Sequence, residues 1–378
     1  MKKTIVCTKE NPLHVQIKKH EKYKIEELKV SGFLGEVDFN FMTAMSQERG
    51  KLRVLDISDV TETECKVYSP AADDYYYSKV GIRDDAFVNS VRLEKVTLPN
   101  GIEQIGNRAF SGCTHLKDVD IPEKVNIWFM AFQNCPLLND FYIEDKNSLD
   151  YICSNAFAGS IKRYFCGLDK WPLYESGQSI FESDYFDIFS FDGAVFFYNA
   201  WGDRIDITLE RYPGGCDRID YLIPEGVTQV KQHVFAGCNN LRTIMFPKSC
   251  RSLKEHAVTD CPNLETLVFK SQSLYGSRVC HWDMYYDNII TKCPKLQDIY
   301  LYAEDPSGID FGIFEELDNI GDIVLHVPCF CAKKYRDYEE EFISFYDYND
   351  KKYVKVWREF KRIEEFDPID TFGERSYN

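Results

Sequence analysis

A recurring pattern of apolar residues constrains this chain more than any other feature of its sequence. With Phe110 as position zero, Cys113 follows at +3 and Leu116 at +6. Val119 and Ile121 then occupy +9 and +11. The same offsets recur, with substitutions, from the anchors Phe87, Phe110, Phe132, Phe235, Val258, Ile290 and Phe314, and in part from Phe157. Anchor spacings of 23, 22 and 25 residues, then 78, then 23, 32 and 24, identify an array of structural repeats.

Each repeat predicts a short strand and a turn on the opposite side. Apolar residues at +6, +9 and +11 indicate a strand whose +9 and +11 side chains point inward. The anchor, which often follows Ala and precedes a small residue and Cys, indicates a short helical turn. One such unit cannot bury its apolar face alone, so consecutive units must stack around a continuous core. We therefore expect an α/β solenoid, a right-handed superhelix with short strands on one face.

The cysteines follow the same register. A total of 14 would ordinarily suggest disulfides or a metal site. Five of them occupy position +3, namely Cys113, Cys135, Cys238, Cys261 and Cys293. Free Cys behaves as a small hydrophobe and is among the most buried residue types. We expect a ladder of reduced core thiols, which is compatible with either a reducing or an oxidising compartment.

Repeat spacing divides the chain into five segments. Lys51–Ile57 supplies a first strand of the repeat type, so the residues before about 60 are expected to cap the open edge of the solenoid. The 78-residue gap contains Asp192-Gly193 between apolar runs, which indicates a β-hairpin. The expected segments are an N-terminal cap (1–60), a first repeat array (61–164), a β-hairpin island (165–222), a second array (223–328) and a C-terminal cap (329–378).

Two local expectations concern an insertion and the C-terminal cap. Residues 73–77 are expected to form a loop. Residues 332–345 predict a helix, and residues 353–366 place apolar side chains at helix-like spacing. A cap over the last repeat explains these aromatic residues better than a cofactor site does.

Charge and hydropathy exclude some partners. The formal net charge is −16, so nucleic acid and anionic membrane surfaces would be repelled over most of this surface. The sequence has no apolar run of 18 residues, so we expect no transmembrane helix. Met1-Lys2-Lys3 is similar to the start of a signal peptide, but the apolar stretch after it is too short. The protein could stay inside the cell, or an export signal could have been removed.

Several motifs resemble the BspA-like leucine-rich repeat of bacterial surface proteins. The repeat motifs are Ala-Phe-x-x-Cys-x-x-Leu at 109–116 and Ile-Pro-x-x-Val at 121–125. The interruption at 192–224 is similar to that family's characteristic hairpin. Residues 38–57 resemble the capping segment of members from gut Bacteroides, and residues 327–363 resemble the family's ending. The resemblance covers nearly the whole chain.

This resemblance implies a place and a role. It implies a location at the cell surface, in the periplasm or outside the cell. It also implies protein binding or adhesion, including binding to host matrix proteins. It supplies no catalytic residues, because the motif is structural, and it leaves the ligand open.

The residues themselves predict no catalytic, cofactor or metal site. Cys113 is close to His115 in sequence, but it occupies a ladder position and should be inert. The two cysteines at 329 and 331 lack the two-residue spacer between ligands, and the second ligand pair, that a structural zinc site has. The Cys, His and Asp at 280–283 are a weak set of metal ligands. Residues 347–352 lack the turn glycine of a calcium loop. An enzyme within 165–204 would need clustered ionisable side chains, and that stretch is instead rich in aromatics.

The strand face is one candidate binding surface. Positions +8 and +10 are expected to be exposed there. They carry acidic residues and a tyrosine in the first array and an apolar column in the second. The candidates are Asp118, Asp120, Asp140 and Tyr142, and then Met245, Val268 and Tyr300. Contiguous exposed apolar groups often mark an interaction site, although a cap could also cover these positions.

Aromatic insertions form the other candidate surface. The residues are Tyr75, Tyr76 and Tyr77 in one insertion and Trp282, Tyr285 and Tyr286 in another. Exposed Tyr and Trp are frequent interface anchors, and repeat insertions often lie on a binding face. The alternative is that the rings fold back to cover the flank of the solenoid.

The leading functional hypothesis is therefore a non-enzymatic recognition module. It would be exported and would bind a protein or a glycan, with host extracellular matrix among its candidate partners. The alternative is a structural or assembly component of a surface complex. A homodimer through the apolar column would favour that alternative, and the sequence leaves the oligomeric state open.

Overall fold

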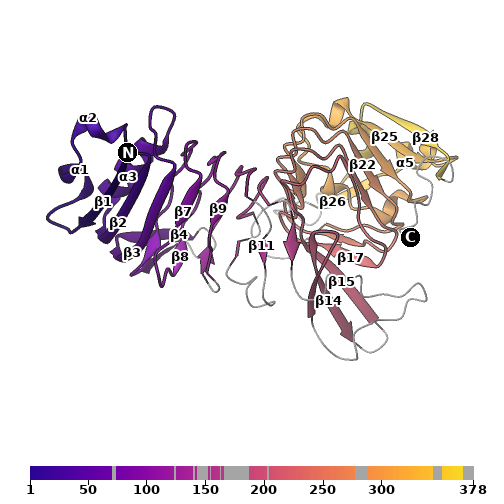
Figure 1. Cartoon of the computed structure of the whole chain (residues 1–378). Helices are drawn as coiled ribbons and strands as arrows, with labels where there is room; N and C mark the ends of the chain where they lie inside the picture. Colours follow the sequence, from indigo (N-terminus) through magenta and orange to yellow (C-terminus); the bar gives the residue numbers. More distant parts are fainter. Residues whose placement is uncertain are drawn as a thin grey trace. The chain divides into compact units, whose positions relative to one another are not determined.

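The computed structural model describes most of both caps and of the repeats (Figure 1). The described residues are 1–69, 74–122, 125–138, 141–142, 152–153, 155–161, 163–165, 187–201, 204–276, 288–343 and 351–368. Internal contacts divide the chain into two units. Unit 1 consists of Met1–Trp171, Asp187–Val195 and Arg211–Cys216, and unit 2 consists of Pro172–Phe186, Phe196–Glu210 and Asp217–Asn378.

Unit 1 is built on a sheet that the N-terminal cap and the first repeats share. The strand order is β1-β2-β3-β7-β9, and every neighbouring pair is parallel (Figure 1). Leu55 of the cap pairs with Val96, as Val96 pairs with Val119 of the next repeat. The cap therefore continues the strand ladder of the solenoid. Its elements are β1 (Lys2–Cys7), α1 (Leu13–Gln16), α2 (Lys19–Lys22), β2 (Glu27–Leu34), α3 (Glu36–Ser46) and β3 (Val54–Thr63), and the repeats add β7 (Lys95–Thr97) and β9 (Asp118–Val119).

Apart from Phe314, which follows a 3-10 turn, the anchor segments do not form the predicted helical turns. In unit 1 they are turns whose backbone N–H groups donate to the next repeat, as Phe110 does to the Ala131 carbonyl at 2.7 Å. The anchor rings stack at centroid distances of 5.1 to 5.3 Å along the unit. N–H groups that bond to the neighbouring repeat alternate with ones that close single turns within their own, as Cys113 does onto the Phe110 carbonyl at 3.2 Å, so no regular helix forms. Short parallel strands accompany these turns, namely β6 (Gly81–Ile82), β8 (Gln104–Ile105) and β10 (Asn126–Ile127). The pair β11 (Phe141–Tyr142) with β12 (Tyr164–Phe165) belongs to the strand positions instead, since β11 holds the +9 and +10 residues after Phe132.

The thiol ladder is confirmed. The five +3 cysteines are buried and free, with exposed fractions of 2 % or less. Each of three ladder thiols donates to the carbonyl of the anchor one repeat earlier, as Cys261 does to Phe235 at 2.9 Å. The thiol thus fills space and satisfies a buried acceptor.

Two hairpins stand out from the repeats. The segment expected as a loop at 73–77 instead contributes β5 (Asp74–Ser78), which pairs antiparallel with β4 (Cys65–Ser69). The predicted turn at Asp192-Gly193 is confirmed between β13 (Asp187–Phe191) and β14 (Ala194–Trp201). Both turn residues have positive φ, 54° and 78°, which suits a two-residue hairpin turn.

Unit 2 carries a second set of parallel ladders. One sheet has the order β16-β19-β22-β24-β25-β28, and another places β15 beside β17 and β17 beside β20. Its strands are β15 (Arg204–Arg211), β16 (Asp220–Leu222), β17 (Val227–Val230), β18 (Phe235–Ala236), β19 (Thr243–Phe246), β20 (Ser252–Leu253), β21 (Val258–Thr259), β22 (Thr266–Phe269), β23 (Ile290–Thr291), β24 (Asp298–Leu301) and β25 (Val324–Pro328). Three of the four anchors here lie in β18, β21 and β23, which again pair across repeats, and the fourth, Phe314, follows a 3-10 turn.

The C-terminal cap differs from its prediction. The helix expected over 332–345 ends early, as α5 (Ala332–Asp337), and is followed by the antiparallel pair β26 (Glu340–Ile343) and β27 (Lys351–Val354). The helix-like spacing at 353–366 belongs instead to a 3-10 turn, η4 (Val356–Glu359), and to β28 (Arg362–Phe366). Strand pairing with β25 determines this outcome, because it extends the sheet by one strand and removes β25 from its edge. Three further 3-10 turns, η1 (Pro306–Gly308), η2 (Phe311–Ile313) and η3 (Ile320–Asp322), precede the cap.

Candidate binding surfaces

The acidic positions of the first array lie in solvent but are partly neutralised. Asp118 and Asp120 are exposed. The Asp118 carboxylate forms an ion pair with Lys95 of the neighbouring strand at 2.5 Å. Asp140 lies outside the described residues, as does the side chain of Tyr142. The structure therefore places two of these four side chains on one strand face.

The apolar column of the second array is less exposed than predicted. In-register pairing of β19, β22 and β24 does align Met245, Val268 and Tyr300. Val268, however, is fully buried, and Met245 and Tyr300 are half-buried. The prediction of exposure is wrong for Val268, which has a large side chain in register on either side.

The C-terminal cap packs against the end of this column. Tyr300 stacks on His326 at a centroid distance of 4.1 Å and meets Phe366 edge-on at 5.3 Å. His326 in turn lies 2.8 Å from the Asp298 carboxylate. Burial, together with Asp298 and Glu364, raises the pKa of Tyr300. This part of the strand face therefore already has an intramolecular partner.

The tyrosine hairpin, defined as β4 and β5, presents aromatic side chains to solvent. Tyr75, Tyr76 and Tyr77 are all exposed, and Tyr77 has 76 % of its surface accessible. Tyr76 packs on Trp128 at 5.1 Å, so one ring does fold back on the solenoid. The ammonium group of Lys66 lies 5.0 Å from the centre of the Tyr75 ring. Trp282, Tyr285 and Tyr286 of the other insertion lie outside the described residues.

A cavity lies beside the tyrosine hairpin. Its volume is about 700 Å³, within the range of roughly 300–1,000 Å³ common for ligand pockets. Tyr75 and Tyr77 contribute to its wall. The remaining lining residues are Glu36, Thr63, Glu64, Cys65, Lys66, Ser78, Arg83 and Asp84. Arg83 is paired with Glu36 at 3.4 Å, which leaves the lining mixed in charge.

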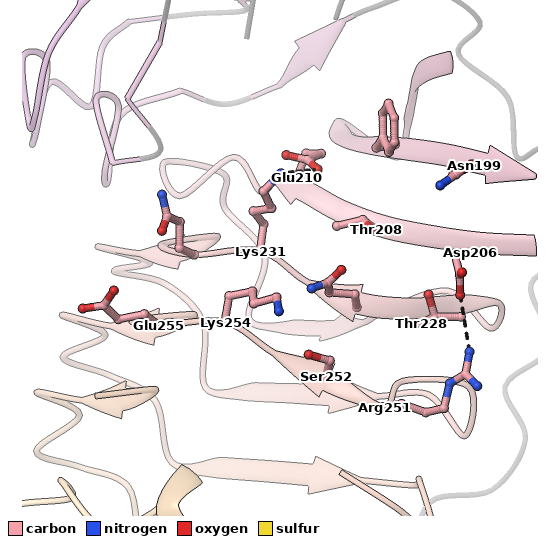
Figure 2. Close-up of a pocket in the computed structure, with 13 residues that line it drawn as sticks. Asn199, Asp206, Thr208, Glu210, Thr228, Lys231, Arg251, Ser252, Lys254 and Glu255 are labelled. Carbon is pink, nitrogen blue, oxygen red and sulfur yellow. Dashed lines mark hydrogen bonds and ion pairs between the residues drawn. The ribbon is translucent and has the colours of Figure 1, made fainter. Parts of the chain in front are cut away.

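Unit 2 contains a second cavity, here called the polar groove (Figure 2). Its volume is about 620 Å³. The polar side chains of β15 line it, while Ile207 and Leu209 between them point into the core and are fully buried. The lining residues are Phe197, Asn199, Asp206, Thr208, Glu210, Thr228, Gln229, Lys231, Gln232, Arg251, Ser252, Lys254 and Glu255.

Two ion pairs join β15 to residues that flank β17 and β20. Lys231 contacts the Glu210 carboxylate at 3.1 Å, and Arg251 contacts Asp206 at 3.4 Å (Figure 2). The Glu210 side chain is only 8 % exposed, so its carboxylate has a fixed position at the groove floor. Each pair links β15 to a different element of the repeats.

The sequence analysis did not single out this groove, although a signal for it was present. Gln229 and Lys231 lie 6 and 4 residues before the anchor Phe235. Ser252 and Lys254 lie at the same offsets before Val258. The repeat comparison considered the residues that follow each anchor and not those that precede it. Polar residues at equal offsets in consecutive repeats must be neighbours in a solenoid.

The described residues also bear on metal binding and on membranes. Among them, no group of three or more His, Cys, Asp or Glu side chains is placed to hold a metal ion. Cys329 is exposed and Cys331 is buried, and both are free. Residues 280–283, which could have supplied ligands, lie outside the described part. Within the described ranges, no helix combines the length and apolar character that a membrane crossing requires.

Comparisons with known proteins agree on the repeat. A family model described as "BspA type Leucine rich repeat region" matches in six copies, over residues 80–187 and 214–329. No curated protein matches the chain.

Solved structures similar to this chain include three bacterial proteins. A leucine-rich cell surface protein of Faecalibacterium prausnitzii is 18 % identical, with a TM-score of 0.44 over 90 % of this chain and 87 % of the other. The pneumococcal vaccine antigen PcpA is 15 % identical, with a TM-score of 0.39 over 82 % and 75 %. A leucine-rich repeat protein of Eubacterium ventriosum is 14 % identical, with a TM-score of 0.39 over 82 % and 67 %.

Proposed function

This chain belongs to the BspA-type leucine-rich repeat family, and on that premise we propose that it is a non-enzymatic recognition module of a bacterial cell surface. Its repeats provide a binding scaffold. We further propose that it binds a protein partner, such as a host matrix glycoprotein, through the tyrosine hairpin. The observation that carries this proposal is the cluster of three exposed tyrosines beside a cavity.

Exposed tyrosines are suited to protein recognition. Tyr buries a large ring at a low cost in side-chain entropy and offers a hydroxyl group to a partner. Tyr77 retains most of its accessible surface, so it has the most to bury on binding. The neighbouring cavity could receive side chains of the partner, as pockets around hot spots do.

The hairpin is held in place before any partner arrives. The buried Gln104 side chain donates to the Tyr76 carbonyl at 3.3 Å and to the Ser78 hydroxyl at 2.9 Å. Tyr76 also packs on Trp128. A preorganised hairpin loses less entropy on binding than a flexible loop.

Binding to immobilised fibronectin, laminin and fibrinogen would test this proposal. We expect saturable binding of the full chain to at least one of them, and a loss of about tenfold or more for Tyr77→Ala, as expected of an interface anchor. Tyr275→Ala is the matched control, because Tyr275 is 53 % exposed but lies in unit 2. Enzymatically deglycosylated ligands should bind equally well if the partner surface is protein.

Two outcomes would contradict the proposal. One is the absence of saturable binding to all three glycoproteins. The other is equal affinity for Tyr77→Ala and the unaltered chain. A homodimer through Met245, Val268 and Tyr300 would favour the alternative of an assembly component. Sedimentation of the full chain tests it, and burial of Val268 argues against it.

A further inference from the structure

We propose that the polar groove of unit 2 is a binding site for a neutral oligosaccharide. The site is separate from the tyrosine hairpin and uses different chemistry. The proposal rests on the charge balance of the groove, on its hydrogen-bonding side chains and on the absence of an open strand edge at its floor.

Charge balance points to a neutral ligand. The groove carries three acidic side chains and three basic ones, namely Asp206, Glu210 and Glu255, and Lys231, Arg251 and Lys254. Two of the acids are paired within the groove, with Lys231 and with Arg251. An anionic or cationic ligand would have to break these pairs and would gain no net attraction. A neutral ligand can use the same groups as hydrogen-bond partners and leave their charges compensated.

The side chains supply donors and acceptors over a short distance. Gln229 and Gln232 each offer both an amide N–H and a carbonyl oxygen, and Thr208 and Ser252 offer hydroxyl groups. The Thr228 hydroxyl donates to the Ile207 carbonyl at 3.3 Å and offers an acceptor. A sugar hydroxyl is itself both donor and acceptor, so it can bond to either kind of partner. Several hydroxyls on adjacent carbons match such a dense and mixed set. An apolar ligand would leave these groups unpaired.

One aromatic side chain accompanies the polar ones. Phe197 of β14 lines the groove and is half-buried. The axial C–H groups of a sugar ring form an apolar face that can pack on such a ring. The groove therefore combines a packing surface with hydrogen-bonding side chains, as small-molecule sites do.

The floor of the groove does not favour an extended peptide. Peptides often bind by adding a strand to an exposed sheet edge, where backbone groups are unpaired. Here β17 lies between β15 and β20, and Ser252 of β20 forms a further bridge to Tyr275. The backbone at the floor is thus engaged in ladders, and recognition must come from side chains.

The floor is also rigid. Ile207, Leu209, Val230 and Leu253 on the opposite sides of these strands are fully buried in the core. The polar side chains are therefore fixed at the strand spacing of about 4.8 Å. The polar residues of β17 and β20 lie at the same offsets before their anchors, so consecutive repeats present similar side chains at a regular interval. Such an arrangement suits a ligand that is itself a chain of similar sugar units.

Affinity electrophoresis and titration calorimetry of the full chain would test this proposal. The probes are the neutral polysaccharides dextran, galactomannan, xyloglucan and arabinoxylan, with polygalacturonate and heparin as anionic comparisons. We expect binding to at least one neutral polysaccharide and none to the anionic polymers. The Gln229→Ala/Lys254→Ala variant should bind at least tenfold more weakly, because it removes one amide and one ammonium group from the groove lining and leaves the two ion pairs of the groove intact.

Controls separate this proposal from the previous one. Gln297→Ala/Lys270→Ala makes the same chemical changes in unit 2 outside the groove and should bind as the unaltered chain does. Tyr77→Ala should also leave polysaccharide binding unchanged. The proposal would be overturned if no neutral polysaccharide bound, if the groove variant bound normally, or if an anionic polymer bound more tightly.

Discussion

The +3 residues show how one position can satisfy packing and hydrogen bonding together. The thiols of Cys113, Cys135 and Cys261 each reach the carbonyl of the preceding anchor, at 3.2, 3.1 and 2.9 Å. Where Ser160 occupies the position, its hydroxyl donates to the Phe132 carbonyl in the same way. The position therefore suits a small donor in an apolar interior, and Cys or Ser occupies it in every repeat except the last, where Leu317 takes its place.

A substitution series at Cys261 follows from this role. We expect Cys261→Ala to lower the free energy of unfolding by about 1–3 kcal/mol, because it removes the donor and leaves a small cavity. Cys261→Ser keeps a donor and should cost about 1 kcal/mol less than Cys261→Ala. Urea unfolding followed by circular dichroism measures both. Cys329→Ala, at an exposed site, is the control, and equal stability of Cys261→Ala and the unaltered chain would contradict the argument.

Buried thiols also predict a response to alkaline pH. Burial, with a smaller contribution from Glu225, raises the pKa of Cys250 from its ordinary value of 9.0 to about 12. The folded state therefore holds this proton more tightly than the unfolded state. The resulting stability is fully present below pH 9 and is lost as pH rises from there through the folded pKa.

The effect of Cys250 can be isolated by comparing it with Ser, which does not titrate in this range. Between pH 8 and pH 10 we expect the unaltered chain to lose on the order of 1 kcal/mol more stability than Cys250→Ser. Urea unfolding at the two pH values measures this difference. Lysines and tyrosines titrate equally in both proteins, so their contributions cancel. Parallel losses in the two proteins would contradict the pKa shift.

At the scale of elements, Asp38 joins two helices of the N-terminal cap. Its buried carboxylate accepts from the Gly35 N–H at the start of α3, at 3.0 Å. It also accepts from the Leu13 N–H at the start of α1, at 2.6 Å. Both N–H groups belong to helix N-termini, which have no partners within their helices.

Loss of this carboxylate should loosen the cap. We expect Asp38→Ala to lower the free energy of unfolding by about 1–3 kcal/mol, because two buried N–H groups lose their acceptor. The loss should be local, so hydrogen exchange at Leu13 and Gly35 should accelerate more than exchange in unit 2. Glu36→Ala, at an exposed position of the same helix, is the control. Unchanged exchange at Leu13 would show that this bond does not hold the cap.

Strands were more predictable from the sequence than the elements between them. In the second array the +9 and +11 side chains, such as Ile299 and Leu301, are buried as predicted, because their spacing follows directly from alternation along a strand. In the first array Val119 and Ile121 are only half-buried. The local structure of the anchor segments was harder to predict, because Ala-Phe followed by a small residue is compatible with a helical turn. The bond from Phe110 to the Ala131 carbonyl of the next repeat, which replaces a bond within the segment, cannot be read from one repeat alone.

The candidate surfaces show the same difference between local and distant effects. Exposure of Tyr75–Tyr77 was predictable, because an insertion outside the repeat register has little core to enter. Exposure of Val268 was predicted wrongly, because its burial depends on neighbouring strands. The polar groove combines a hairpin strand with residues that precede two anchors, and its formation depends on the pairing of β15 with β17. No pattern within one repeat reveals that pairing.

At the scale of the whole molecule, the division of contacts into two units has a thermodynamic consequence. In a solenoid, stability is approximately a sum of repeat terms and nearest-neighbour interface terms. A perturbation is therefore transmitted chiefly through adjacent repeats. Phe110 lies in the ring stack of unit 1, whereas Phe269 stacks on Phe246 at 4.6 Å in unit 2. Each side chain is fully buried, so each can report on its own unit.

Paired large-to-small substitutions test whether the units unfold separately. Phe110→Ala and Phe269→Ala should each cost about 3–5 kcal/mol, because each removes a buried ring and leaves a cavity. In differential scanning calorimetry we expect two transitions, with Phe110→Ala lowering the midpoint of one and Phe269→Ala lowering the midpoint of the other. Tyr77→Ala, which removes an exposed ring from unit 1, should move neither by more than a degree or two. A single transition that both core substitutions lower equally would instead mean that the contacts between repeats couple the whole chain into one cooperative unit.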